Sequence, residues 1–257
     1  VTFAPEAVKH GAIVIDNGAD FRMEPDVPLV VPEVNPKDVK KAKRGIIANP
    51  NCSTIQMVVA LAPVHNLYKI KRVIVSTYQA ASGAGSKAVE ELFCQTKDVL
   101  EGKEAKSQAL VKRIAFNLFP HIGGLSDCDF TTEEWKMVKE TQKIMHSDKI
   151  MVSATTVRVP VKTGHSEAVY IETKKPINID EARKAIASYP GIVVIDDLKN
   201  CGYPLPVDCE GKDEVFVGRI RKDPYNDKGM WLWVVSDNLR KGAASNAVQI
   251  AELLIKK

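Results

Sequence analysis

The stretch GIIANPNCST, residues 45–54, decides how the chain is organised around it. Its first part, Ile46 to Ala48, is a short continuous apolar run, which predicts a buried parallel strand. After it, the apolar residues 55–67 predict a mostly buried helix that begins near Ser53. Cys52 is therefore expected where a strand gives way to a helix N-terminus.

The segments before this junction predict two further strands. Residues 11–16 form an apolar run that ends at an Asp-Asn-Gly turn, which is typical of a parallel strand. Residues 27–34 repeat the pattern, although Pro28 and Pro32 limit its regularity. The opening residues 1–6 look helical, so this part of the chain is α/β-like.

The segments after the junction predict an α+β body. Residues 73–78 are β-branched and aromatic, which favours a strand, and a turn of small residues at 79–85 leads into a helix. That helix has one apolar face, formed by Ala88, Val89, Leu92 and Phe93. The other predicted elements are strands at 151–161, 167–173, 192–196, 214–221 and 230–236, and a helix at about 180–189. Together they predict a mixed or antiparallel sheet.

Two more helices are predicted from their own signals. Thr131 and Glu134 have the spacing of a capping box, so a helix should run from there to about residue 146, with Trp135 and Val138 facing inward. Residues 239–257 predict a closing amphipathic helix. Its expected apolar stripe consists of Ala243, Ala247, Ile250, Ala251 and Leu254.

Composition excludes several classes of protein. The chain has 257 residues, a formal charge of +4, 45% hydrophobic residues and 26% charged residues, which together exclude disorder. The small charge excess argues against a nucleic-acid or membrane partner. No apolar run approaches the ~20 residues of a spanning helix. The five cysteines are odd in number and widely spaced, which fits a reducing cytoplasm better than a disulfide framework.

Cys52 is the candidate nucleophile. A helix N-terminus lowers the pKa of a thiol, and the thiolate is the reactive form. Asn51 and Ser53 could donate hydrogen bonds to a developing oxyanion. The alternative is a buried structural cysteine, which is the better interpretation for Cys94, Cys201 and Cys209.

His165 is the candidate base, because it follows a glycine turn and precedes a strand, so that its ring could project from the end of a sheet. His121, in an apolar loop, is its rival and could equally be a packing residue. The other histidines look like helix ends or surface positions, and they are His10, His65 and His146.

Two arginines are candidate anion binders. Arg158 lies within a β-branched strand and needs a partner there, either a substrate carboxylate or a structural salt bridge. Arg22 follows a strand end, where a plain surface arginine is the more common explanation. Glu133 and Lys136 are three residues apart on one helix face, which usually means a surface ion pair.

Four long motifs in order resemble those of the aspartate-semialdehyde dehydrogenase family. They are NPNCSTIQ at 49–56, STYQAASGAG at 76–85, RVPV at 158–161 with GHSEA at 164–168, and DNLRKGAA at 237–244. The resemblance runs from the first residues to the last helix. It implies an NADP-dependent enzyme that reversibly converts β-aspartyl phosphate to aspartate semialdehyde through a cysteine thioester, in lysine, methionine, threonine and isoleucine biosynthesis.

The resemblance also implies a role for each site residue. Cys52 matches the nucleophile, His165 the acid/base, and Gln79 the residue that orients the cysteine intermediate. In the substrate site, Arg158 matches the binder of the α-carboxylate and Glu133 that of the amino group. The phosphate-side groups match Arg22, Asn51 and Lys136. The nicotinamide contacts match Ser82, Gly83, Gly85 and Asn238. No metal is implied.

The resemblance implies a partial Rossmann-type NADP-binding domain and a catalytic and dimerisation domain with a mixed sheet. The first would comprise residues 1–51 with the closing helix 239–257, and the second residues 52–238. The family's opening strand and glycine-rich phosphate turn do not appear, so roughly 70 to 80 residues are expected to be missing before Val1. A homodimer or tetramer is implied.

Two alternatives stay open. N-acetyl-γ-glutamyl-phosphate reductase also uses a cysteine nucleophile and a histidine acid/base. Glu133 argues against this alternative, because an N-acetylated substrate has no ammonium group to pair with a carboxylate. An inert, truncated assembly domain is the other alternative, supported only by the absent N-terminal part.

Overall fold

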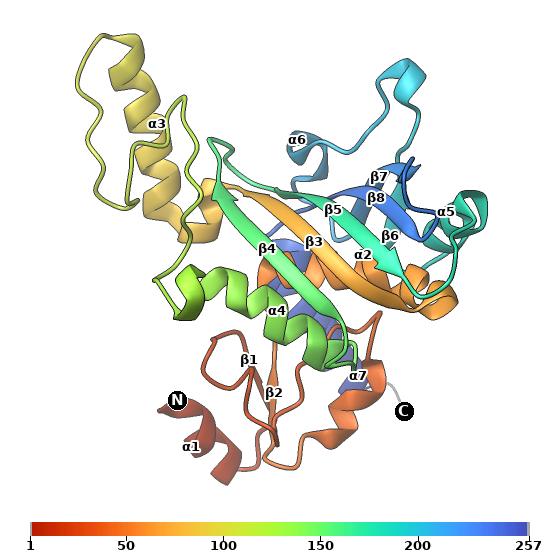
Figure 1. Ribbon diagram of the computed structural model, residues 1–257. Coiled ribbons are helices and arrows are strands. Elements are labelled where there is room, and N and C mark those ends of the chain that lie inside the picture. The colour runs from red at the N-terminus through yellow and green to blue at the C-terminus, as the bar shows by residue number, and fades with distance from the viewer. Residues whose placement is uncertain (1, 256–257) are drawn as a thin grey trace.

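The computed structural model describes residues 2–255, which are built around a mixed sheet of six strands in the order β4-β3-β5-β8-β7-β6 (Figure 1). The strands are β3 (Ile70–Gln79), β4 (Met151–Arg158), β5 (His165–Thr173), β6 (Ile192–Val194), β7 (Val215–Lys222) and β8 (Gly229–Ser236). The β3–β4 and β6–β7 pairs are parallel, and the other pairs are antiparallel. The strands predicted after residue 70 are therefore confirmed, with small shifts at their ends.

A layer of helices covers one face of this sheet. It consists of α4 (Thr132–Ile144), α2 (Cys52–Tyr68) and α5 (Ile179–Ala187), with α2 packed between the other two. Because α2 contacts the sheet and both neighbouring helices, it is buried on nearly every side, as its apolar sequence predicted. The capping box at Thr131 is confirmed, since Thr131 Oγ1 accepts from Glu134 N–H and Glu134 Oε2 accepts from Thr131 N–H.

A second region holds the N-terminal segments and the last helix, in the lower part of Figure 1. There β1 (Val14–Asp16) pairs in parallel with β2 (Ile46–Ala48). Around them lie α1 (Phe3–Lys9), the 3₁₀ turn η1 (Pro36–Lys41) and α7 (Ser245–Ile255). α7 packs against η1 and β1, and it buries Ile250 beside Ile47. Residues far apart in the chain thus form this small core.

An arm projects from the end of the sheet, at the upper left of Figure 1. It contains η2 (Ala81–Ala84) and α3 (Ser86–Leu100) and the long loop that returns from α3. The short helix α6 (Pro206–Cys209) lies on the other side of the sheet's upper edge. The remaining turns are η3 (Asp127–Asp129), η4 (Leu198–Asn200) and the π-helical turn η5 (Arg240–Ala244).

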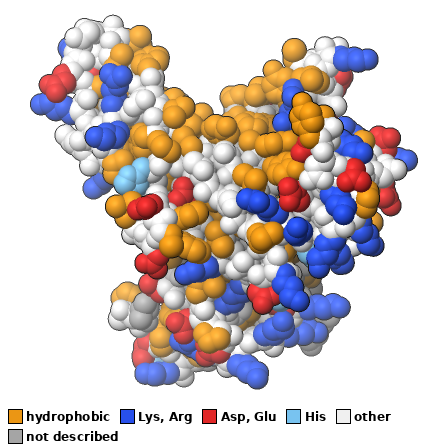
Figure 2. All heavy atoms as spheres, viewed as in Figure 1, with side chains coloured by type: hydrophobic (Ala, Val, Ile, Leu, Met, Phe, Trp, Pro, Cys, Tyr) orange, Lys and Arg blue, Asp and Glu red, His pale blue; other side chains and the backbone are white. Residues whose placement is uncertain are grey.

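Figure 2 shows basic and acidic side chains interspersed over the visible face, with hydrophobic side chains gathered along the upper edge between the arm and α6. Among residues 2–255, no helix combines the length and the apolar character needed to cross a membrane.

The predicted parallel strand at 11–16 is confirmed only in its second half, and the predicted strand at 27–34 is wrong. Only Val14–Asp16 of the stretch 11–16 is a strand, because Gly11, at φ +85°, ends α1 instead. Residues 27–34 form just one bridge to β2, at Leu29. Prolines there cannot donate to a ladder, and the side chain of Asn35 hydrogen-bonds backbone groups of residues 29 and 31.

Two predicted helix faces are only partly correct. The buried face of α4 carries Met137 and Ile144, whereas Trp135 and Val138 are only half-buried. The predicted helix 239–257 begins as the π-helical turn η5, and its described α-helical part ends at Ile255. Leu254 of the expected stripe is exposed. The predicted elements at Val1 and at 256–257 lie outside the described residues.

Candidate active site

A cavity of about 370 Å³ opens where the N-terminus of α2 meets α4, the end of β3 and the turn η5. Ten of the twelve predicted site residues line it. They are Arg22, Asn51, Cys52, Gln79, Ser82, Gly83, Glu133, Lys136, Arg158 and Asn238. The fold thus brings together side chains from segments spread over more than 200 positions of the sequence.

Cys52 is the first residue of α2, and Asn51 is the N-cap. Asn51 Oδ1 accepts from the N–H groups of Ser53 and Thr54, at 3.0 and 3.2 Å. Asn51 Nδ2 donates to Glu133 Oε1 at 2.8 Å. Asn51 and the Ser53 N–H are therefore engaged in capping the helix, contrary to the expectation that they are free to stabilise an oxyanion.

The thiol of Cys52 does not have the lowered pKa that its position predicted. Burial, and after it the nearby carboxylate of Glu133, raise the pKa of Cys52 to about 12. The Ser53 N–H, Arg158 and Arg22 lower the pKa, but burial outweighs them. Without a ligand, this thiol is protonated at neutral pH.

Glu133 is buried in the wall of the cavity, where its carboxylate accepts hydrogen bonds from three side chains. It is 5% exposed, and its Oε1 accepts from Asn51 and, at 3.3 Å, from Gln79 Nε2. Its Oε2 accepts from Lys136 Nζ at 3.1 Å. The expected i,i+3 pair with Lys136 exists, but it lines the cavity, so the surface interpretation is wrong.

Arg158 holds its guanidinium in the cavity with most of its donors unused. Its Nη1 donates to the carbonyl of Ala80 at 2.6 Å. In the described part of the chain, no carboxylate lies within ion-pair distance of it, so the structural salt bridge considered as an alternative does not form. Burial lowers the pKa of Arg158, while Cys52 and Glu133 raise it. An anionic ligand would supply the missing counter-charge.

Arg22 is 8% exposed, so the prediction of a plain surface arginine is wrong. Its Nη1 donates to Glu140 Oε1 and its Nη2 to the carbonyl of Asn17, both at 3.1 Å. Its Nε is buried without a partner.

His165 begins β5 and is fully buried, rather than projecting freely from the sheet. Its Nδ1 accepts from the Ala80 N–H at 3.0 Å, which places the ring proton on Nε2. A Cβ added at Gly83 would lie 3.0 Å from Nε2, so the ring borders a residue that lines the cavity. Burial, and then Arg158, hold the pKa of His165 well below its usual range. The ring is thus a neutral donor in this arrangement. Its rival His121 is exposed.

The predicted nicotinamide contacts divide into two groups. Ser82 and Asn238 hydrogen-bond each other at 3.0 Å and line the cavity with Gly83. Asn238 Oδ1 also accepts from the Gly164 N–H at 2.9 Å. Gly85 lies outside the cavity lining, and with a φ of +94° it turns the chain into α3.

Sequence reasoning missed two residues of this site. Glu140 lies two turns after Glu133 on the same buried face of α4, a spacing that could have revealed it. Gly242 lies in η5, and a Cβ there would be 2.9 Å from Cys52 Cβ. Nothing in the local sequence signals that close approach.

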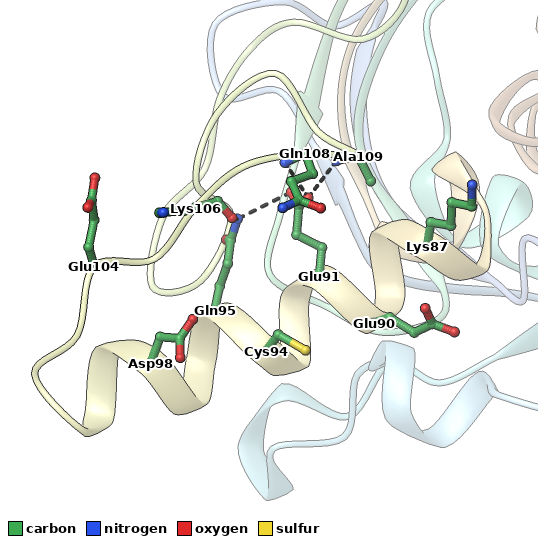
Figure 3. Close-up of a pocket in the computed structure, with 10 residues that line it drawn as sticks. All are labelled: Lys87, Glu90, Glu91, Cys94, Gln95, Asp98, Glu104, Lys106, Gln108 and Ala109. Atoms are coloured by element: carbon green, nitrogen blue, oxygen red, sulfur yellow. Dashed lines mark hydrogen bonds between the residues drawn. The ribbon is translucent and has the colours of Figure 1, made fainter.

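A larger cavity, of about 800 Å³, lies on the arm between α3 and the following loop (Figure 3). It is lined by the exposed Cys94 and four carboxylates, but by no predicted site residue. Within residues 2–255, no cluster of three or more His, Cys, Asp or Glu side chains could hold a metal ion.

This geometry, a cysteine at a helix N-terminus among cations with spare donors, defines a class of thiol-dependent enzymes that act on small anionic substrates. Family models place the chain within that class: "Semialdehyde dehydrogenase, dimerisation domain" matches residues 61–241, and "Semialdehyde dehydrogenase, NAD binding domain" matches residues 1–42.

The chain is 59% identical over 257 residues to the aspartate-semialdehyde dehydrogenase of Aquifex aeolicus, covering 99% of this chain and 76% of that relative. The crystal structure of aspartate semialdehyde dehydrogenase II complexed with ASA from Vibrio cholerae has a TM-score of 0.97 and 48% identity, over 100% of this chain and 76% of that one. The structure of the Candida albicans enzyme with NADP has a TM-score of 0.72 and 27% identity, over 96% of this chain and 72% of that one.

The chain belongs to the aspartate-semialdehyde dehydrogenase family. It is an oxidoreductase with a nicotinamide cofactor and small-molecule substrates, and it has the family's dimerisation domain. The reductase of N-acetylated substrates and the inert assembly domain are not favoured.

Proposed function

We propose that the Cys52 cavity interconverts aspartate semialdehyde, phosphate and NADP⁺ with β-aspartyl phosphate and NADPH, through a thioester on Cys52. The observation that carries the proposal is the arrangement of charge around the thiol. Arg158 and Arg22 each keep unused donors in the cavity, and Glu133 supplies a carboxylate beside them. An α-amino acid that reacts with phosphate needs two anion sites and one cation site.

The amino-acid end of the substrate would bind at Arg158 and Glu133. Arg158 would pair with the α-carboxylate through its free guanidinium edge, and Glu133 would accept from the ammonium group, with Gln79 beside it. This pairing has a chemical consequence, because the charge of Glu133 raises the pKa of Cys52. A bound ammonium group offsets that charge and thereby favours the thiolate.

The phosphate would bind on the other side of the thiol, at Arg22 and Lys136 with Asn51 nearby. Arg22 keeps one N–H on each of Nη1 and Nη2 that Glu140 and Asn17 do not use, and Lys136 spends one of its three donors on Glu133. The two anion sites thus flank Cys52.

The chain's own residues account for the bond changes. The Cys52 thiol releases its proton to solvent, which the ammonium group bound at Glu133 favours, and its thiolate adds to the aldehyde carbon while the His165 Nε2–H stabilises the developing oxyanion. The carbon then loses a hydride to the oxidised cofactor, which gives the thioester, and a phosphate oxygen displaces the Cys52 thiolate. For His165 to move a proton as a full acid/base, the bond from Ala80 N–H to its Nδ1 has to break.

The residues present fit a nicotinamide ring, which supplies the hydride acceptor when bound. Ser82, Gly83 and Asn238 would hold it, with Gly85 shaping the turn, and the absence of side chains at Gly83 and Gly242 leaves the approach to Cys52 open. The preference for NADP over NAD is supported by the Candida albicans structure, which contains NADP.

Assembly as a homodimer or tetramer belongs to the same proposal. The sheet face opposite α2 carries Ile74, which is 39% exposed, and the half-buried Tyr78, Trp231 and Trp233. An uncovered apolar face of this kind is typical of an interface. A cytoplasmic location and the division into 1–51 with 239–257 and 52–238 stay predictions.

The test of the proposal separates the two anion sites. Arg158→Lys keeps the charge but loses the planar fork, so kcat/KM for the semialdehyde should fall about 100-fold, with little change in the KM for phosphate. Arg22→Ala should raise the KM for phosphate and should change kcat/KM for the semialdehyde much less. Steady-state kinetics with both substrates varied would measure this, and equal changes in both constants for both variants would contradict the two-site arrangement.

A further inference from the structure

Glu140 is a buried carboxylate on α4 to which neither the sequence motifs nor the proposed chemistry gives a role. Its side chain is 1% exposed. Its Oε1 accepts from Arg22 Nη1 at 3.1 Å, and its Oε2 accepts from the backbone N–H of Asn51 at 2.7 Å. Burial raises the pKa of Glu140, whereas the charge of Arg22 and the two hydrogen bonds oppose that rise and favour the ionised carboxylate.

The two groups that Glu140 binds come from different parts of the chain. Arg22 follows β1, whereas Asn51 follows β2 and caps the helix that begins with Cys52. Glu140 itself belongs to α4, which packs on the main sheet. One carboxylate therefore fixes a cavity arginine and the nucleophile's turn with respect to the same helix.

The hydrogen bond to Glu140 also determines which N–H donors of Arg22 remain available to a ligand. Glu140 uses one Nη1 hydrogen and Asn17 uses one Nη2 hydrogen, so the guanidinium is held from two sides. The Nε of Arg22 stays buried and unpartnered, in a residue that lines the cavity. A guanidinium held in this way loses little further freedom when it binds an anion.

We propose that Glu140 is a positioning residue that orients Arg22 toward phosphate and fixes the turn carrying Cys52. This inference rests on the proposed phosphate site at Arg22, and it assigns the orientation of that site to a residue outside the cavity lining. Loss of the carboxylate should weaken phosphate binding and alter the reactivity of Cys52 together.

The chain offers a matched control on the same helix. Glu134 is 8% exposed, and its carboxylate also accepts two backbone N–H groups, from Thr131 at 2.7 Å and Thr156 at 3.1 Å. Among the described residues its carboxylate forms no hydrogen bond or ion pair with Arg22 or Asn51, and it does not line the cavity. Glu134→Gln therefore reproduces the loss of a buried, hydrogen-bonded carboxylate without touching the site.

The experiment follows the alkylation of Cys52 by iodoacetamide while inorganic phosphate is titrated, with thermal melting measured on each sample. In the unchanged chain, phosphate beside the thiol should slow alkylation. Glu140→Gln should raise the half-maximal phosphate concentration about tenfold or more, the range expected for a hydrogen bond between charged groups. Glu134→Gln should leave it within twofold. In the active enzyme, Glu140→Gln should raise the KM for phosphate tenfold and that for the semialdehyde less than threefold.

The outcomes separate this inference from the proposed function. If phosphate does not affect alkylation in the unchanged chain, the phosphate site itself is wrong, and the inference falls with it. If phosphate protects the unchanged chain and Glu140→Gln equally, or if Glu134→Gln shows the same shift, the positioning role alone is wrong. Should Glu140→Gln fail to fold, Glu140→Asp keeps the charge but shortens its reach, and an unshifted phosphate titration in it would overturn the inference.

Discussion

Buried polar side chains occur both in the Cys52 cavity and in the arm around α3, but they are used differently. In the arm, Glu91 accepts from the backbone N–H groups of residues 108 and 109 (Figure 3) and of residue 110. Gln95 Oε1 accepts from those of residues 114 and 115. In the cavity, Arg158 spends one donor on a backbone carbonyl, and His165 Nε2 has no partner. The arm's polar groups hold its own loop, whereas those of the cavity keep capacity for a ligand.

This difference identifies the site better than cavity size does. The arm encloses about 800 Å³ and the cavity at Cys52 about 370 Å³. A buried donor without a partner costs free energy, and an anionic ligand in the Cys52 cavity would supply the bonds that Arg158 lacks. By that criterion the smaller cavity is the functional one.

The largest expected effect comes from removing the nucleophile. Cys52→Ser should reduce semialdehyde oxidation at least 1000-fold, because a serine hydroxyl has no thiolate-like form at neutral pH. The rate is measured with aspartate semialdehyde, phosphate and NADP⁺, and Cys94→Ser, in the arm, is the control. Activity of Cys52→Ser within tenfold of the unchanged enzyme would show that the Cys52 cavity is no more important for catalysis than the arm.

A smaller effect is expected from the missed residue Gly242. An alanine Cβ there would lie 2.9 Å from Cys52 Cβ, so the turn or the nucleophile has to shift, and kcat should fall about tenfold or more. Gly124→Ala is the matched control, because its Cβ would meet no atom within 4 Å. Equal kcat values for the two variants would show that the contact with Gly242 does not position the thiol.

The sequence predicted most of this site but not its electrostatics. Motif resemblance identified ten residues that the fold does bring to one cavity, and strand and helix patterns located the main sheet. The pKa of Cys52 was predicted in the wrong direction, because helix position is visible in a sequence and burial beside Glu133 is not. The tautomer of His165 likewise depends on the Ala80 N–H, a contact between residues 85 positions apart.

The fold errors have a similar origin. Residues 11–16 and 27–34 have strand-like composition, but a glycine at positive φ and the side chain of Asn35 decide their structure. On α4, hydrophobicity favoured Trp135 as an inward residue, whereas the buried face carries carboxylates whose partners come from distant segments. Patterns of hydrophobicity cannot reveal partners of that kind.

Glu167 is another residue whose surroundings the sequence does not reveal. It is buried on β5, and among the described residues neither of its carboxylate oxygens has a hydrogen-bond partner. Burial raises the pKa of Glu167 well above its usual range, and the Gln56 side chain only partly opposes this. The folded state therefore keeps a proton that the unfolded chain releases above about pH 4.5. As the pH rises from there toward the folded-state pKa, stability should fall, at about 1.4 kcal/mol per pH unit for this group.

Glu167→Gln should remove this dependence. The variant should be more stable than the unchanged chain at neutral pH, with the difference vanishing near pH 4, and its kcat should be unchanged. Urea unfolding between pH 4 and pH 8 measures the slope. Identical slopes for both proteins would mean that Glu167 is ionised in the folded state and is stabilised by a partner.

The smallest effect on catalysis is expected in the arm. Glu91 is 9% exposed, and its carboxylate holds the loop through Gln108 N–H at 2.6 Å and Leu110 N–H at 3.2 Å. Glu91→Gln replaces one acceptor oxygen by a donor, which takes the acceptor from backbone N–H groups of the loop and should cost about 1 kcal/mol. Because the arm projects from the sheet, the cost should appear as local opening rather than global unfolding (Figure 1).

Hydrogen exchange over residues 104–115 should speed up at least fivefold in Glu91→Gln, while kcat/KM stays within twofold. The control Glu90→Gln, at an exposed neighbouring position, should change neither quantity. A loss of activity in Glu91→Gln as large as that in Gly242→Ala would mean that the arm's polar groups serve the active site as well as their own loop.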